Sequence, residues 1–314
     1  MKKYKSIELC SGAGGQAIGL ESAGFEHILL VDNDYHACQT LLINRPTWNV
    51  QCCDLKKIDV SQYKDIDLLA GGVPCPPFSI AGKQLGEFDE RNLFPDFLRI
   101  TQECMPKAIL IENVRGIMTS KFDFFREKII SEVKKLGYIG EWRLLNACDF
   151  GVSQLRPRAV FVAFKNDLYK NFIWPSKNGK TIKTVGEVLF SEMKKNNWKC
   201  AEEWKIKAND IAPTIVGGSK KHGGPDLGPT RARKAWALLG VDGMGIVEEP
   251  PKFDFRGNPR LTISMVSLLQ GFPKKWKFFG KKTPAYRQIG NAFPPPVAKA
   301  IGLQIKKVLS ENGV

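Results

Sequence analysis

Short apolar runs alternate with amphipathic stretches over the first half of the chain. The runs have the length of strands, while the apolar residues between them recur at helical spacing. Because strands that are separated by helices pair in parallel, this pattern predicts an α/β fold with a doubly wound, mostly parallel sheet. We expect strands at residues 6–10, 27–31, 48–53, 66–70, 108–111, 138–147 and 159–164, and helices at 15–24, 35–44, 94–100 and 122–136.

The regular alternation ends near residue 165. Residues 166–271 are richer in lysine, glycine and tryptophan, and they hold 17 basic and 11 acidic side chains. The tryptophans Trp198, Trp204 and Trp236 favour a small folded domain over a disordered insertion. We therefore expect one domain from residues 1–165 and 272–314 and a second, loop-rich domain from residues 166–271. A helix is expected at 261–270, and a final helix at 297–309 belongs to the first domain.

The net charge of the chain indicates the kind of partner that it binds. Of the 314 residues, 47 are lysine or arginine and 32 are acidic, which gives a net charge of +15. Such an excess favours a polyanionic partner, although it would also arise from solvated lysines in a lysine-rich chain. No apolar run has the length of a membrane span, and the first residues lack the apolar core of a signal peptide. We expect a cytoplasmic protein that does not contact a membrane.

The eight cysteines and three histidines do not form a metal-binding pattern. No pair of cysteines has CxxC spacing. We therefore expect neither a structural zinc site nor a disulfide framework.

A glycine-rich turn follows the first expected strand. Residues 11–17 read Ser-Gly-Ala-Gly-Gly-Gln-Ala, a G-x-G-x-x-A pattern that lets the backbone approach a ligand at a helix N-terminus. Asp34 lies about 20 residues further on, where an acid usually accepts a ribose hydroxyl. Asp34 and Tyr35 would then hold a ribose and stack on an adenine. The alternative is that Asp34 only caps the helix 35–44.

Cys75 stands in a turn that is stiffened by prolines. It follows an apolar run and two glycines, and its neighbours are Pro74, Pro76 and Pro77. These residues argue against a helix or strand interior, so Cys75 is either an exposed nucleophile or a buried, inert thiol. The polar stretch 79–92 that follows either closes over a substrate or is a solvated connection.

Several candidate residues follow neighbouring strands of the expected sheet. In open α/β sheets, ligands bind beyond the carboxyl ends of the strands. Two arginines, Arg156 and Arg158, would project the same way if their segment is extended. The basic, loop-rich stretch 213–225 and the arginines that follow it would track phosphates. The residues expected at the carboxyl edge are Gly12, Asp34, Asp54, Cys75 and Glu112.

These motifs resemble those of the C5-cytosine DNA methyltransferase family, in the single-chain form typical of bacterial restriction–modification systems. The resemblance covers essentially the whole chain except about 166–255. It rests on six motifs in the family's order, at residues 8–15, 74–83, 112–114, 154–158, 269–273 and 288–291.

The resemblance implies a fold, a reaction and a cofactor. The fold would be Rossmann-like, with a catalytic first domain and a target-recognition second domain. Cys75 would attack C6 of a flipped-out cytosine, Glu112 would hydrogen-bond N3, and Arg158 would contact O2 with Arg156 nearby. S-adenosyl-L-methionine would be held by Ser11, Gly12, Gly14, Gly15, Asp34, Tyr35, Asp54, Leu55, Pro74, Asn291 and Phe293.

The resemblance also implies partners. The substrate would be double-stranded DNA, contacted by a monomer. A cognate restriction endonuclease would be linked in function without physical contact. The DNA-binding side chains would include Ser79, Lys83, Lys220, Lys221, Arg231 and Arg233.

Three positions depart from the family pattern. Cys10 replaces the usual phenylalanine, Pro76 replaces the glutamine after the catalytic cysteine, and residues 263–267 lack the usual Arg-Glu pair. A tRNA cytosine-5 methyltransferase and a catalytically silent DNA-binding regulator are the alternatives. Such a regulator typically loses the cysteine or the glutamate, and this sequence keeps both.

Overall fold

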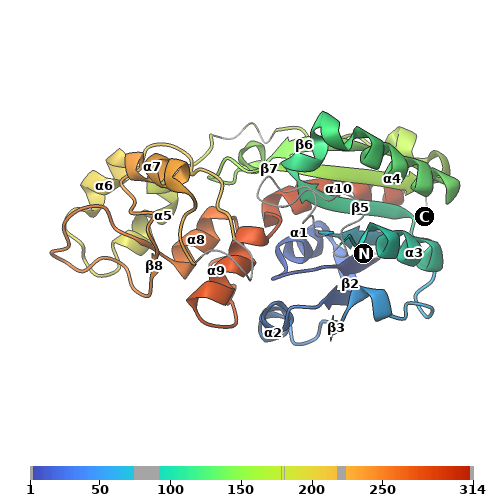
Figure 1. The fold of residues 1–314 in the computed structure, drawn as a ribbon, viewed down its shortest axis with the longest axis horizontal. Coiled ribbons are helices and arrows are strands. Elements are labelled where there is room, and N and C mark those ends of the chain that lie inside the picture. Colours follow the sequence, from blue (N-terminus) through green and yellow to red (C-terminus); the bar gives the residue numbers. More distant parts are fainter. Residues whose placement is uncertain (1–2, 74–91, 178, 180, 218–223, 312–314) are drawn as a thin grey trace. The chain divides into compact units, whose positions relative to one another are not determined.

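A seven-stranded sheet lies at the centre of the first structural unit (Figure 1). The computed structural model describes residues 3–73, 92–177, 179, 181–217 and 224–311. Strands β1 to β5 pair in parallel in the order β3-β2-β1-β4-β5, and β7 joins β5 antiparallel with β6 beyond it. The mostly parallel, doubly wound sheet is confirmed. The strands are β1 Tyr4–Leu9, β2 Phe25–Asp32, β3 Val50–Cys52, β4 Leu68–Gly71, β5 Ala108–Val114, β6 Tyr138–Asn146 and β7 Pro157–Lys165.

Helices pack on both faces of this sheet. Ile7 and Leu9 of β1 share one apolar core with Phe97 of α3 and Ile129 of α4. On the other face α10 packs against α1, where a Cβ on Gly302 would lie 2.9 Å from that of Ala23. The helices are α1 Gly15–Ala23, α2 Tyr35–Asn44, α3 Phe94–Cys104, α4 Asp123–Lys135 and α10 Pro295–Glu311, with short 3₁₀ turns η1 Leu55–Lys57, η3 Arg115–Met118, η4 Ser120–Phe122, η5 Ala147–Phe150 and η6 Asn166–Asn171.

The second unit is mainly helical and has its own core. Trp198, Trp204 and Trp236 are buried in it, and the indole N–H of Trp204 donates to the Gly240 carbonyl at 2.9 Å. Its elements are α5 Val185–Met193, α6 Ala201–Lys207, α7 Thr230–Leu238, β8 Ile246–Val247, β9 Leu261–Thr262, α8 Ile263–Leu269 and α9 Lys282–Asn291.

The two units divide the chain at other places than the composition suggested. The first unit comprises residues 1–145, 157–175 and 297–314, and the second comprises 146–156 and 176–296. Segment 272–296, expected in the first domain, therefore packs within the second unit. The functional roles expected of the two domains stay predictions.

Two local expectations also differ from the structure. Residues Leu261 and Thr262 form a short strand rather than the start of a helix, because the Thr262 hydroxyl caps α8 by accepting the Met265 N–H at 3.3 Å. Strand β5 continues past Ile111 to Val114, because its pairing with β7 extends to Arg158. Within the described parts of the chain, every helix is too short or too polar to cross a lipid bilayer.

Candidate active site

The glycine turn lies at the carboxyl end of β1 and opens α1. Gly12 and Gly14 have φ of 52° and 85°, and Cys10 shares this left-handed conformation with φ 53°. A Cβ added to Gly12 would meet no atom of the described residues within 4 Å, so they leave the space above the turn open. Gly14 caps α1 without a side-chain hydrogen bond, and Gly15 begins the helix. The first N–H groups of α1 are therefore oriented as donors for an anionic ligand group.

Asp32 holds this turn from the neighbouring strand. Its Oδ2 accepts the Gly12 N–H at 2.7 Å, and its Oδ1 accepts the Asp34 N–H at 2.8 Å. Burial raises the pKa of the Asp32 carboxyl, and the backbone N–H donors oppose that shift. Sequence reasoning missed Asp32. The available signal was its place as the last residue of β2, beside the end of β1.

Asp34 caps α2, as the alternative reading of this residue predicted. Its Oδ1 accepts the His36 N–H at 2.9 Å and the Ala37 N–H at 3.4 Å. Tyr35, the first residue of the helix, is 58% exposed, and its ring lies edge-on to that of His36 at 6.1 Å between centroids. A ribose contact from Asp34 stays a prediction.

The remaining candidate cofactor residues of the first unit lie at the same sheet edge. Asp54 follows β3 and caps η1 by accepting the Lys56 N–H at 3.0 Å. Leu55 is buried directly after it, and the Ser11 hydroxyl donates to the Val31 carbonyl at 3.2 Å. The carboxyl ends of β1, β2 and β3 thus bring the glycine turn, Asp34 and Asp54 to one edge.

A buried ion pair occupies strands β5 and β7. The Nε of Arg158 lies 2.8 Å from Oε1 of Glu112, and both residues are less than a tenth exposed. Arg158 also donates to the Pro157 carbonyl at 2.9 Å. Burial lowers the pKa of Arg158, while the Glu112 carboxylate acts in the opposite direction.

Glu112 lies beside the start of the proline–cysteine segment. A Cβ on Gly72 would lie 3.5 Å from Oε2 of Glu112, and the Asn113 side-chain amide donates to the Val73 carbonyl at 3.3 Å. Gly72 and Val73 are the last described residues before that segment. Among the candidate residues, Pro74, Cys75, Ser79, Lys83, Lys220 and Lys221 lie outside the described part of the chain.

Arg156 makes other contacts than Arg158. It is fully buried in the second unit, where its guanidinium donates to the carbonyls of Ile215 and Gly290 at 2.6 Å each and of Ala292 at 2.9 Å. Arg156 precedes β7, which begins at Pro157, and it belongs to the other unit. Its contacts therefore differ from those of Arg158, and the expectation that the two side chains project the same way stays a prediction.

The other candidates of the second unit lie at its surface or in its core. Asn291, the last residue of α9, is exposed, and Phe293 is buried. Arg231 is exposed and Arg233 is half-buried on α7. Their roles toward a cofactor or DNA stay predictions.

Glu8 is a second residue that sequence reasoning missed. It is 1% exposed, and one of its carboxylate oxygens, Oε2, has no hydrogen-bond partner within the described part of the chain. Burial raises its pKa well above the usual value, against a hydrogen bond from the backbone of Ala17 in α1. Glu8 thus lies beneath the first turns of α1. The available signal was an acidic residue between two apolar residues of the strand, Ile7 and Leu9.

Comparison with known proteins identifies the family. The model of the C-5 cytosine-specific DNA methylase family matches residues 4–307. The chain is 53% identical over 313 residues to the type II methyltransferase M.NgoMIV of Neisseria gonorrhoeae, covering 99% of both chains. It is 50% identical over 319 residues to the type II methyltransferase M.NaeI of Lentzea aerocolonigenes, covering 100% of this chain and 77% of the relative. The structure of the methyltransferase EhMeth of Entamoeba histolytica has a TM-score of 0.67 at 17% identity over 100% of both chains. With its glycine turn, its buried glutamate and a family match over nearly its whole length, the chain belongs to the C-5 cytosine-specific DNA methylases.

Proposed function

We propose that this enzyme transfers a methyl group from S-adenosyl-L-methionine to C5 of a cytosine in a short, specific site of duplex DNA. One observation carries the assignment of the active site. The buried carboxylate of Glu112 is oriented by Arg158 at 2.8 Å and lies against Gly72, three residues before Cys75. Addition to a pyrimidine ring requires an acid and a thiol, and Cys75 follows Gly72 closely in the sequence.

In this mechanism Cys75 is the nucleophile. Its thiolate adds to C6 of the cytosine, which moves electron density to C5 and makes that carbon nucleophilic. Glu112 in its protonated form donates a hydrogen bond to N3 and stabilises the negative charge that develops there, and Arg158 contacts O2. After the methyl group has been transferred, loss of the C5 proton and departure of the thiolate restore the aromatic ring.

The described residues fit S-adenosyl-L-methionine. Its methionine carboxylate would bind the N–H groups at the start of α1, above the open face of Gly12. Asp34 and Tyr35 would hold the ribose and the adenine, with Asp54 and Leu55 beside them. When bound, this group supplies an electrophilic methyl carbon on a sulfonium.

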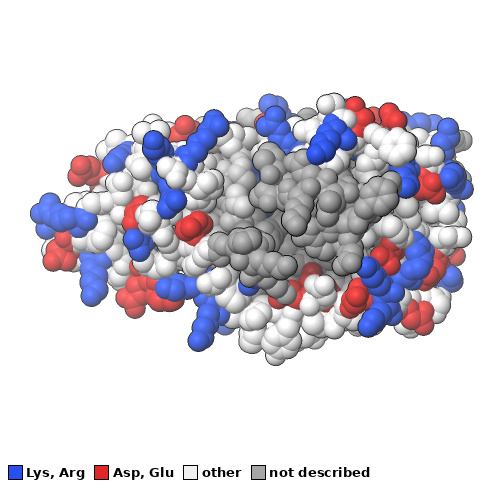
Figure 2. All heavy atoms as spheres, viewed as in Figure 1, with Lys and Arg blue, Asp and Glu red and all other residues white. Residues whose placement is uncertain are grey.

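The target base must leave the duplex, because C5 and C6 lie within the stack. Flipping costs a few kcal/mol, which contacts to the backbone must offset. Over the described part of the face in Figure 2, lysines and arginines alternate with acidic side chains and do not form one continuous patch. The net charge of +15 favours binding to DNA of any sequence, and individual lysine and arginine side chains would contact the phosphates.

We further propose that the enzyme protects host DNA in a restriction–modification system. Two relatives, M.NgoMIV at 53% identity and M.NaeI at 50% identity, are named type II methyltransferases, and this supports a role in restriction–modification. The enzyme would act as a monomer in the bacterial cytoplasm. Its cognate endonuclease would share the site without binding the enzyme.

The test is transfer of labelled methyl from S-adenosyl-L-methionine to duplex DNA, with 5-methylcytosine identified by mass spectrometry of the nucleosides. Cys75→Ala should abolish transfer and keep cofactor binding, whereas Cys200→Ala in the second unit should keep both. Transfer to tRNA but not to DNA would favour the RNA-directed alternative. Binding of DNA without transfer to either would favour a silent regulator.

A further inference from the structure

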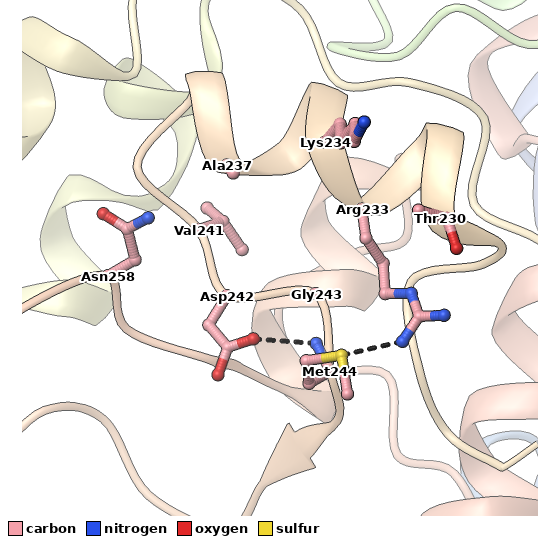
Figure 3. A pocket seen from close by; sticks show the side chains of 9 residues that line it. All are labelled: Thr230, Arg233, Lys234, Ala237, Val241, Asp242, Gly243, Met244 and Asn258. Carbon is pink, nitrogen blue, oxygen red and sulfur yellow. Dashed lines mark hydrogen bonds between the residues drawn. The ribbon is translucent and has the colours of Figure 1, made fainter.

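A hollow of about 610 Å³ lies on the second unit, between α7 and the loop that follows it (Figure 3). Thr230, Arg233, Lys234 and Ala237 line it from α7. Their spacing of three and four residues places them on one face of the helix. Met244 of the following loop lines the hollow opposite the Arg233 side chain.

The cations of this hollow have no anionic partner in the described part of the chain. Arg233 donates to the sulfur of Met244 at 2.7 Å, and a thioether is a weak acceptor. Its Nε is buried with no hydrogen-bond partner there. The carboxylate of the lining, Asp242, pairs with Arg260 at 2.7 Å and accepts the Met244 N–H at 2.9 Å. The positive charge of Arg233 and Lys234 is thus not neutralised within the hollow.

The start of α7 adds donors to the same face. Pro229 precedes the helix and offers no side-chain cap, and the first turn carries no acidic residue. Thr230, the first residue of the helix, brings a hydroxyl to the rim. The N-terminal N–H groups and the positive end of the helix therefore favour an anion near the two cations.

We propose that this hollow binds a phosphate group of the DNA backbone. The inference rests on the proposed function, because it identifies DNA as the ligand. A phosphodiester presents only acceptors, which suits a guanidinium, an ammonium and a hydroxyl on one helical face. The major-groove edges of adenine and cytosine present a donor and would call for an acceptor in the lining, whereas guanine presents acceptors alone, so the dependence of binding on DNA sequence distinguishes a phosphate from a guanine. A phosphate contact fixes the position of the enzyme on DNA without reading its sequence.

The test uses the full chain without cofactor, with binding to fluorescent 30-base-pair duplexes of varied sequence measured by anisotropy at several salt concentrations. Arg233→Gln/Lys234→Gln should weaken binding roughly tenfold to all duplexes alike. The slope of log K against log salt should fall by about one. Arg233→Lys/Lys234→Arg keeps both charges and should retain most of the affinity.

The control is Lys134→Gln/Lys299→Gln, which removes the same charge from exposed positions outside the hollow. It should leave the slope unchanged. Equal effects of the two glutamine pairs, or no effect of the first, would overturn the proposal. A loss confined to certain sequences would also overturn it and assign a base contact. Since binding is measured without methyl transfer, failure of the methylation assay would refute the proposed activity and leave this result standing.

Discussion

Arg158 of β7 holds the carboxylate of Glu112 on β5, with Nε and Oε1 2.8 Å apart across an antiparallel strand pair. In the register Glu112 faces Val160 and Arg158 faces Val114, so the ion pair is diagonal. The sheet itself therefore orients the acid beside Gly72, at the start of the segment that carries Cys75.

Glu112→Gln should lower the rate of methyl transfer roughly 10²- to 10⁴-fold, because the amide cannot exchange a proton with N3. Single-turnover kinetics with saturating DNA and cofactor measures this effect.

Arg158→Ala should lower the free energy of unfolding by about 3–5 kcal/mol, because it leaves a buried carboxylate unpaired. The double variant Glu112→Gln/Arg158→Ala should recover part of that loss, as measured by urea unfolding. A double variant that loses the sum of both single effects would contradict coupling of the pair.

Arg156→Met should destabilise the second unit. The guanidinium donates to the carbonyls of Ile215, Gly290 and Ala292. Its removal takes this donor from the buried Ile215 and Gly290 carbonyls, while the Ala292 carbonyl still accepts from the Gln270 side-chain amide at 2.8 Å. We expect a loss on the order of 3 kcal/mol in the free energy of unfolding. Arg231→Met, at an exposed position, is the control and should change stability by less than about 0.5 kcal/mol. An equally small effect at Arg156 would show that it does not brace this unit.

Substitutions of Asp34 separate its capping role from a cofactor role. Asp34→Ser keeps a cap but has a shorter side chain, so it should weaken the affinity for S-adenosyl-L-methionine while the melting temperature stays nearly unchanged. Asp34→Ala should also lower the free energy of unfolding by about 1 kcal/mol. Isothermal titration with cofactor and thermal melts measure the two effects. Unchanged cofactor affinity in both variants would leave Asp34 as a cap alone.

The stability of the first unit should fall on acidification because of His27. Its Nε2–H donates to the Ala17 carbonyl at 2.8 Å, and its Nδ1 lies 3.0 Å from the Ser6 hydroxyl. Burial lowers the pKa of His27 below its usual 6.5. The stabilisation is therefore complete above about pH 6.5 and is lost as the pH falls through the lowered pKa. Melting temperatures from pH 8 to 5 should drop less for His27→Gln than for the wild type.

Gly290→Ala should disrupt the second unit. A Cβ at this position would lie 2.3 Å from the N atom and 2.4 Å from the Cα of Gly217, both of them backbone atoms that cannot rotate away. We expect a loss of about 1–3 kcal/mol or more in the free energy of unfolding. Gly224→Ala is the matched control, because its Cβ would meet no atom of the described residues within 4 Å. Chemical denaturation of both variants checks this, and equal stabilities would contradict the close approach.

The sequence alone determined the elements whose signals are local. The apolar runs of β1 and β2, the glycines around α1 and the stretch Tyr35–Asn44 of α2 are each defined by neighbouring residues, and the structure has them where they were expected within one or two positions. The order of motifs also sufficed to indicate the family. In each case the physical cause, periodic burial or a special backbone angle, acts over a few residues.

Only the tertiary structure decided the relationships between distant segments. Two arginines that are two residues apart went to different units, because β7 begins between them and the preceding segment packs with residues 215 and 290. The support of the glycine turn came from Asp32, and the orientation of Glu112 came from the register of β5 with β7. Hydrogen bonds and ion pairs across strands depend on sheet order and register, which are set by packing over the whole unit and leave no mark in the spacing of neighbouring residues.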